Sequence, residues 1–193
     1  MNNNFNYEEF LINKLMSHPN GKLLTDDHIC EIVDIYDNKI YEDGEPYSCI
    51  GDNCYHWGFL VWGLFKVSNY KNKGKKEIMR DFNFEGYNIV VGDMDAIMLN
   101  EKSKYNIVSK GQSNVLHTTD GKFNVLARRI HPLAGIGKAF IQSSGSAKKN
   151  YHAGNEDLTC PEKYVKFNCD FINLGDNMDK AEKTDFLNIS RNS

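Results

Sequence analysis

Apolar residues recur at helical spacing in the first part of the chain. Phe10, Leu11 and Leu15 lie on one face of a helix predicted over residues 7–17. A second helix is predicted to begin at Thr25, because Thr is a favoured N-cap and two acidic residues follow it. The buried stripe expected for this second helix consists of Ile29, Ile32, Val33 and Tyr36.

The widest apolar face is predicted for residues 57–68. Positions i, i+3, i+4, i+7 and i+8 of this segment are all apolar, namely Trp57, Leu60, Val61, Leu64 and Phe65. That spacing is typical of a helix buried on a broad face. We therefore expect a central helix here, opening just after Asp52 and Asn53.

From Phe82 onward the pattern favours strands, over residues 87–91, 96–99, 114–119, 122–127, 135–141 and 164–172. The Asp120-Gly121 pair predicts a hairpin turn. Helices followed by strands indicate an α+β domain, with N-terminal helices and a central buried helix packed on a mostly antiparallel sheet. We expect one such domain over residues 1–175 and a polar, flexible tail over 176–193.

Composition narrows the class of protein. The 193 residues are 40% hydrophobic with a net charge of −3, so a sizeable core is expected and a nucleic-acid partner is not. The apolar runs are too short to span a bilayer, and the amino terminus lacks the features of a signal peptide. We expect a cytoplasmic protein with no membrane partner, and leave open export by a specialised system.

The cysteine count is odd, which without a secretory signal indicates reduced thiols. Four cysteines stand in C-x4-C and C-x8-C spacings that differ from the tight pairs of zinc ribbons and fingers. We therefore expect neither a metal nor another cofactor. The five residues are Cys30, Cys49, Cys54, Cys160 and Cys169.

Cys54 is the candidate nucleophile. In the first turn of the predicted central helix, the positive end of the helix dipole would stabilise its thiolate. His117, downstream on a predicted strand, is the candidate base. Asn124 or Gln142 would orient His117, and the remaining candidates, Asp52 and Asn53, would support an oxyanion hole.

The segment Gly51-Asp-Asn-Cys-Tyr-His-Trp-Gly58 resembles the active-site signature of ovarian-tumour-type deubiquitinases. It is also similar to the Asp-x-Cys helix opening of bacterial cell-wall peptidases and type VI amidase effectors. This resemblance implies a papain-like cysteine hydrolase acting on a protein or peptide. The bond cleaved would be an amide, an isopeptide or the side-chain amide of glutamine, as suits a microbial or viral effector.

Two other classes of protein stay open. Leu116-His-Thr-Thr119 and the Ser-rich segment 143–151 resemble the His-Tyr-Glu class of ADP-ribosyltransferases, which implies NAD binding at His117 and Glu162 as the catalytic acid. A non-catalytic inhibitor or adaptor would instead use exposed aromatic residues as binding anchors, such as Tyr36, Tyr41 and Tyr47. A buried, inert Cys54 would favour the non-catalytic class.

Overall fold

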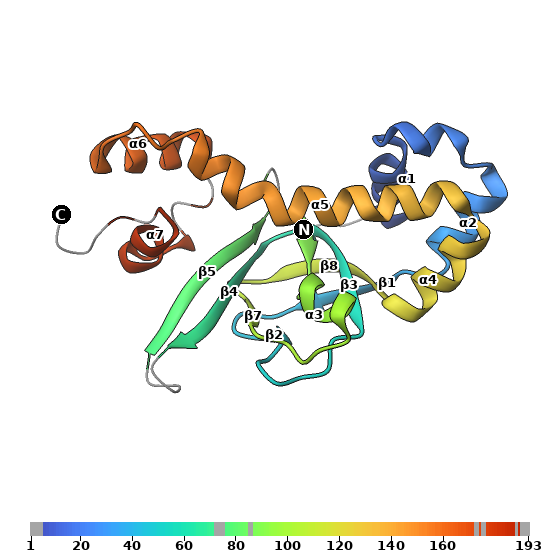
Figure 1. Cartoon of the computed structure of the whole chain (residues 1–193), viewed down its shortest axis with the longest axis horizontal. Coiled ribbons are helices and arrows are strands. Elements are labelled where there is room, and N and C mark those ends of the chain that lie inside the picture. Colours follow the sequence, from blue (N-terminus) through green and yellow to red (C-terminus); the bar gives the residue numbers. More distant parts are fainter. Residues whose placement is uncertain are drawn as a thin grey trace.

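The computed structural model describes residues 6–71, 76–84, 87–171, 174, 177–187 and 189. Two antiparallel four-stranded sheets pack face to face, and helices surround the sandwich that they form (Figure 1). Aliphatic and aromatic side chains from both sheets meet between them, among them Leu60, Phe65, Ile107 and Val115.

Each sheet mixes strands from distant parts of the sequence. Sheet A has the order β1-β8-β3-β6, formed by Asp37–Tyr41, Ser113–Thr119, His56–Trp62 and Val90–Val91. Sheet B has the order β2-β7-β4-β5, formed by Pro46–Ser48, Asn106–Ser109, Leu64–Lys71 and Lys76–Phe84. The described pairings are antiparallel.

The helices lie outside the sandwich. The N-terminal elements α1, η1 and α2 comprise Tyr7–Met16, Pro19–Leu23 and Asp26–Val33. A short α3 (Met94–Leu99) follows β6, and α4 (Asp120–Arg129) leads into the long α5 (His131–Ala153). In Figure 1, α5 runs along the sandwich from the end where α1, α2 and α4 gather to the end of α6 and α7, Cys160–Asp170 and Lys180–Phe186.

A second core lies on the outer face of sheet A, beneath the helices. Trp57, Phe59 and Leu116 of the sheet are fully or almost fully buried there. The helices cover them with Leu11, Leu15, Ile32, Leu126, Leu133 and Ile136. The central strands β3 and β8 are therefore covered on both faces.

The helices predicted near the amino terminus are confirmed. The α1 helix covers residues 7–16 and buries Leu11 and Leu15, and α2 begins at Asp26. Thr25 caps α2 as expected, since its hydroxyl accepts a hydrogen bond from the backbone N–H of His28. Of the expected stripe on α2, Ile32 is the fully buried member.

The predicted central helix over residues 57–68 is wrong. The papain-like arrangement, which required that helix, is wrong as well. This segment forms β3 and β4, which meet at Gly63 with φ +102°. Trp57 and Phe59 point toward the helices while Leu60 points into the sandwich. Because a strand buried on both faces is apolar throughout, it satisfies helical spacing as readily as the alternation of a strand.

The hairpin predicted at Asp120-Gly121 is also wrong, because α4 begins there. The Thr119 hydroxyl accepts a hydrogen bond from the N–H of Lys122 and caps the helix. Residues 135–141 and 164–167, predicted as strands, lie within α5 and α6. The mostly antiparallel sheet is present, but as one half of a sandwich.

The segment expected to be a flexible tail contains α7. Phe186 is fully buried, and Glu182 and Thr184 are each 8% exposed. The described part of this tail is therefore packed against the sandwich. The division into a domain over 1–175 and a tail over 176–193 stays a prediction.

Candidate ligand-binding site

A cavity of about 510 Å³ lies beside the inner face of sheet B, between the turn from β6 to α3 and the middle of α5. The register of β4 and β5 explains which side chains reach it. Val67 pairs with Asp81, and both side chains face the cavity. The next pair along, Lys66 and Phe82, lies on the opposite face of sheet B. Further lining comes from Asn83, Asp93, Tyr105, Ile107 and Ser144.

Two buried asparagines join three sides of the cavity. The Asn83 side-chain amide donates to the carbonyl of Val90 at 2.7 Å and to that of Asn88 at 3.4 Å. Asn88 Oδ1 accepts from the Ser144 hydroxyl of α5 at 2.6 Å. Within the described residues, Asn83 Oδ1 is buried and accepts no hydrogen bond. Leaving a buried acceptor without a hydrogen bond reduces stability by about 1–3 kcal/mol. A ligand whose donor reaches Asn83 Oδ1 would remove this penalty and bind more tightly.

Asp93 forms the wall at the start of α3. Its side chain is 4% exposed and accepts hydrogen bonds from the N–H of Ala96, the N–H of Lys104 and the Ser103 hydroxyl. A carboxylate of the chain therefore already binds the amide groups at this helix start. With Asp95 also lining the cavity, this wall is acidic and does not favour an anion.

Two cations also line the cavity. Arg80 lies on β5, where its Nε donates to Asn69 Oδ1 at 2.8 Å, and Lys149 lies on α5. Asp81 completes the acidic side chains. The described lining residues therefore include two cations and three carboxylates, which gives no excess of positive charge. Such a field favours an uncharged ligand over a phosphate.

A separate polar cluster lies on sheet A, where β3 and β8 place His56 and His117 side by side. The ring centroids are 6.1 Å apart, and the Tyr47 ring is 4.8 Å from that of His56. Burial lowers the pKa of both imidazoles, and the neighbouring His56 lowers that of His117 further. Both rings therefore favour the neutral form.

Cys54 lies in the loop between β2 and β3 rather than at a helix start. Burial raises the pKa of its thiol; a hydrogen bond with Ser103 offsets part of that rise, and the carboxylates of Asp93 and Asp52 raise the pKa further. Its Sγ donates to the backbone carbonyl of Asp52 at 4.0 Å. The thiol is thus held protonated, opposite to what a nucleophile requires.

Each of the predicted catalytic residues has its own partners among the described residues. Asn124 is exposed on α4 and donates to the carboxylate of Asp120 at 2.7 Å, and Gln142 is exposed on α5. In the described part of the chain, no hydrogen bond or ring contact joins His117 to Cys54, Asn124 or Gln142.

Asp52 and Asn53 hold one loop against another. The Asp52 carboxylate accepts from the N–H of Cys49 at 2.8 Å, and its carbonyl accepts from the N–H of Ser103 at 2.8 Å. Asn53 forms a β-bridge with Lys102. These bonds fix the loop before β3 against the segment after α3, which also supports Asp93.

Glu162 and the cysteines do not form the sites considered from the sequence. Glu162 caps α6, where hydrogen bonds from Thr159 lower the pKa of its carboxyl. Across the residues described, no three His, Cys, Asp or Glu side chains come together as metal ligands. All five cysteines are free thiols.

The cavity residues were missed in the sequence because their signal is local and weak. Asn83 interrupts the aromatic pair Phe82 and Phe84, and a polar residue within such a run on a strand marks the opposite face. Gly92-Asp93 by itself indicates only a turn between two apolar segments. Which other segments would face these residues depends on pairing between strands far apart in the sequence.

Taken together, the two antiparallel sheets, the short helix between β6 and β7, and the long helix after β8 define a class of fold. It resembles the cyclic-nucleotide-binding domain, a mostly antiparallel β-sandwich with flanking helices. Known family profiles do not match the chain, and neither do curated protein sequences.

Individual solved structures make the likeness specific. The guanosine-bound regulatory subunit of a cAMP-independent protein kinase A from Trypanosoma cruzi aligns with TM-score 0.55 and 13% identity over 78% of this chain and 51% of that one. A triple mutant of the Trypanosoma brucei subunit, bound to cAMP in its A site, aligns with TM-score 0.55 and 17% identity over 79% and 52%. The Thermus thermophilus catabolite activator protein aligns with TM-score 0.54 and 14% identity over 93% and 82%.

At these identities the likeness establishes the fold alone, and this chain spans about half the length of the kinase regulatory subunits. It nevertheless corrects the resemblance drawn from the sequence. The fold is not that of papain-like cysteine hydrolases, and the expected thiol hydrolase function is wrong, as is the ADP-ribosyltransferase alternative. The short motif around Cys54 gave a wrong prediction because it lies in a loop between two strands and not at the start of a helix.

Proposed function

We propose that this chain is a ligand-binding regulatory domain, and that its ligand occupies the cavity between sheet B, α3 and α5. The observation that carries this proposal is the cavity itself, with its buried Asn83 and Asn88 amides and a wall from α5. A small molecule there would contact two strands, the α3 turn and a long helix at once. Its binding therefore has a direct route to elements outside the sandwich.

We propose further that the ligand is an uncharged nucleoside rather than a cyclic nucleotide. The wall formed by residues 92–95 carries Asp93 and Asp95 and no Lys or Arg, so a cyclic phosphate would meet like charge. The Trypanosoma cruzi neighbour is bound to guanosine, and one substitution in the cAMP-bound Trypanosoma brucei mutant introduces an arginine. The guanosine complex supports an uncharged nucleoside as the class of ligand.

The roles of the side chains follow from their chemistry. Asp95 lies exposed at the cavity and would accept hydrogen bonds from ribose hydroxyls, as acidic residues do in other nucleotide sites. Asn83 Oδ1 would accept from an exocyclic amine or ring N–H of the base. Tyr105 and Ile107 would pack against the base plane.

The test is a thermal-shift and calorimetric titration with guanosine, inosine and adenosine against cAMP and cGMP. A nucleoside at about one hundred times its Kd should stabilise the protein by about 2.7 kcal/mol. Asp95→Ala should weaken that binding at least tenfold by the loss of a charged acceptor, whereas Asp157→Ala, on the surface between α5 and α6, should not. Tighter binding of cAMP than of any nucleoside, or no binding by any of them, would overturn the proposal.

A regulatory domain acts on something else, and we propose a protein partner in place of the substrate expected from the sequence. The five free thiols support the cytoplasm as its compartment. For the described residues, the structure contains no helix that is long and apolar enough to cross a membrane.

A further inference from the structure

The outer face of β4 and β5 is covered by the C-terminal helices. Phe82 of β5 contacts Phe186 of α7, with ring centroids 5.9 Å apart. Phe84, two residues along the same face, contacts Phe171 at 4.8 Å, just beyond α6. Without α6 and α7, these aromatic side chains would face solvent.

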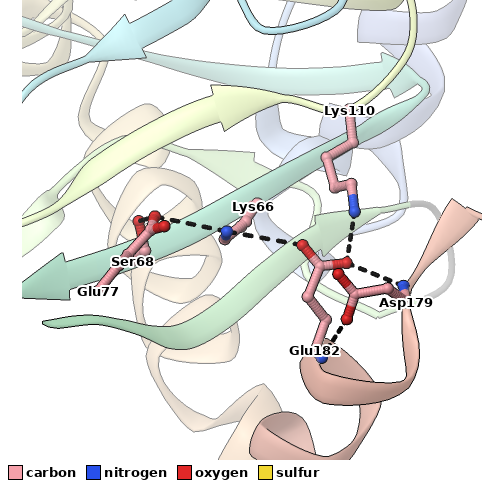
Figure 2. A network of polar contacts seen from close by, with 6 residues as sticks. All are labelled: Lys66, Ser68, Glu77, Lys110, Asp179 and Glu182. Carbon is pink, nitrogen blue, oxygen red and sulfur yellow. Dashed lines mark hydrogen bonds and ion pairs between the residues drawn. The ribbon is translucent and has the colours of Figure 1, made fainter.

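A buried carboxylate fastens α7 to the same face (Figure 2). Glu182 is 8% exposed and forms ion pairs with Lys66 of β4, at 3.6 Å, and with Lys110 of the β7–β8 turn. Its backbone N–H donates to Asp179 and its carboxylate accepts from the Asp179 N–H, so it also caps the helix. A buried carboxylate is stable only while its cations stay in place, so the docked position depends on both lysines.

The same network continues along the strands. Lys66 lies 3.4 Å from Glu77 of β5, and Glu77 accepts a hydrogen bond of 2.6 Å from the Ser68 hydroxyl. Figure 2 shows these groups in one line from β5 through Lys66 to α7. A change in the pairing of β4 with β5 would therefore move a partner of Glu182.

The docked position is also imperfectly packed. A cavity of about 560 Å³ lies between the sandwich residues Leu64 and Phe84 and the C-terminal residues Phe171 and Leu174. At the corner between α5 and α6, the Tyr151 hydroxyl and Asn155 Oδ1 are buried, and neither forms a hydrogen bond within the described residues. Voids and unpaired polar atoms both reduce the stability of a contact, whereas undocking would hydrate these atoms.

The two faces of β4 and β5 thus serve two purposes. The pair Val67 and Asp81 lines the ligand cavity, and the adjacent pair Lys66 and Phe82 holds α7. The cavity and the docked helix are separated by the thickness of one two-stranded ribbon.

We propose that α6 and α7 form a latch with a docked and an open state, and that ligand in the cavity favours the docked state through β4 and β5. This inference rests on the proposed function for its ligand. A ligand that contacts Val67 and Asn83 orders the ribbon, and an ordered ribbon keeps Lys66 and Phe82 in the positions that α7 requires. Because coupling is reciprocal, opening the latch lowers the affinity for the ligand by a certain factor, and the bound ligand shifts the equilibrium toward the docked state by the same factor.

The first measurement needs no ligand. Hydrogen exchange of the full chain is followed in the wild type, in Glu182→Gln and in Lys110→Gln, with Glu156→Gln, an exposed acid between α5 and α6, as the matched control. Glutamine keeps the size and the capping acceptor of Glu182 and removes its charge. The amides of α7 should exchange at least tenfold faster in both latch variants, through an opening in which those of β3 and β8 remain protected.

The second measurement adds guanosine at saturation. Exchange of α7 in the wild type should slow about fivefold, and the Kd of guanosine for Glu182→Gln should rise with the fraction of open molecules, reaching the same factor when the variant is fully open. Glu156→Gln should bind guanosine as the wild type does.

Each outcome decides one part. If α7 exchanges only together with β3 in the wild type, and no faster in the latch variants, the latch is overturned. If guanosine binds but changes neither the exchange of α7 nor, in Glu182→Gln, its own Kd, the coupling is overturned and the proposed function stands. If guanosine does not bind, the coupling fails with the proposed ligand, and the exchange of α7 still decides the latch.

Discussion

At the scale of the residue, the environment of a side chain outweighs its type. The sequence singled out Cys54 because a helix start would lower the pKa of a thiol. The loop before β3 instead places it beside Asp52 and Asp93 with partial burial, and the pKa is raised. Asp93 could not be assigned to this neighbourhood in advance, since it reaches Cys54 through the turn between β6 and α3.

The paired histidines make stability depend on pH. Because burial lowers the pKa of His56 and His117 below that of the unfolded chain, about 6.5, the folded state favours their neutral forms. The stabilisation that they provide is complete above pH about 6.5 and is lost as pH falls through their folded pKa values. Urea unfolding between pH 7.5 and 5 should show the free energy of unfolding decreasing on acidification.

His117→Gln should flatten that decrease, because one of the two titrating rings is removed. His131→Gln, an exposed residue at the start of α5, is the matched control and should leave the slope unchanged. A slope that is the same in all three proteins would contradict the argument.

At the scale of the element, close packing of strands explains why β3 carries a glycine. A Cβ at Gly58 would lie 2.4 Å from the carbonyl oxygen of Leu116 and 2.8 Å from the Cα of His117. Both are backbone atoms of β8, so the two central strands of sheet A would have to separate. Gly58→Ala should therefore destabilise the protein by about 3 kcal/mol, at the upper end of ordinary substitutions.

Gly121→Ala is the matched control, because a Cβ there meets no atom within 4 Å and the residue lies in the first turn of α4. It should be neutral or stabilise by up to about 1 kcal/mol. Denaturant midpoints of the two variants check both expectations. Equal midpoints would show that β3 and β8 tolerate the added methyl group.

The errors in predicting elements have a common physical origin. Alternation over residues 135–141 favoured a strand, yet Ile136 and Phe140 are four residues apart and face sheet A from α5. Thr119 could equally have begun a turn or capped a helix. Short apolar segments satisfy both periodicities, and only the surface that they pack against selects one.

At the scale of the whole molecule, the central strands of sheet A are buried on both faces because they contribute to both cores. Sheet A lies between the sandwich interior and the helical layer, so β3 and β8 have neither face in solvent. Their amides should be the slowest to exchange hydrogen, at the free energy of global unfolding, and those of α1 should be faster. Exchange measured by mass spectrometry at several denaturant concentrations checks this order, and slower exchange in α2 than in β3 would contradict it.

Local features that depend only on neighbours in the chain could be predicted without the structure. These are the two N-terminal helices with the Thr25 cap, reduced cysteines, and enough apolar residues for a substantial core. Capping and amphipathic periodicity act over a few residues, so one chain suffices to read them.

The remaining features of the fold and the candidate site depend on contacts between distant parts of the chain. The pairing of β3 with β8 turned the expected central helix into two strands, and the facing of β4 and β5 placed Asn83 inside a cavity and Phe82 beneath α7. Contacts between residues far apart in sequence select among local alternatives of nearly equal free energy. For this reason the fold and the candidate site could not be predicted from local sequence patterns and are seen only in the paired sheets.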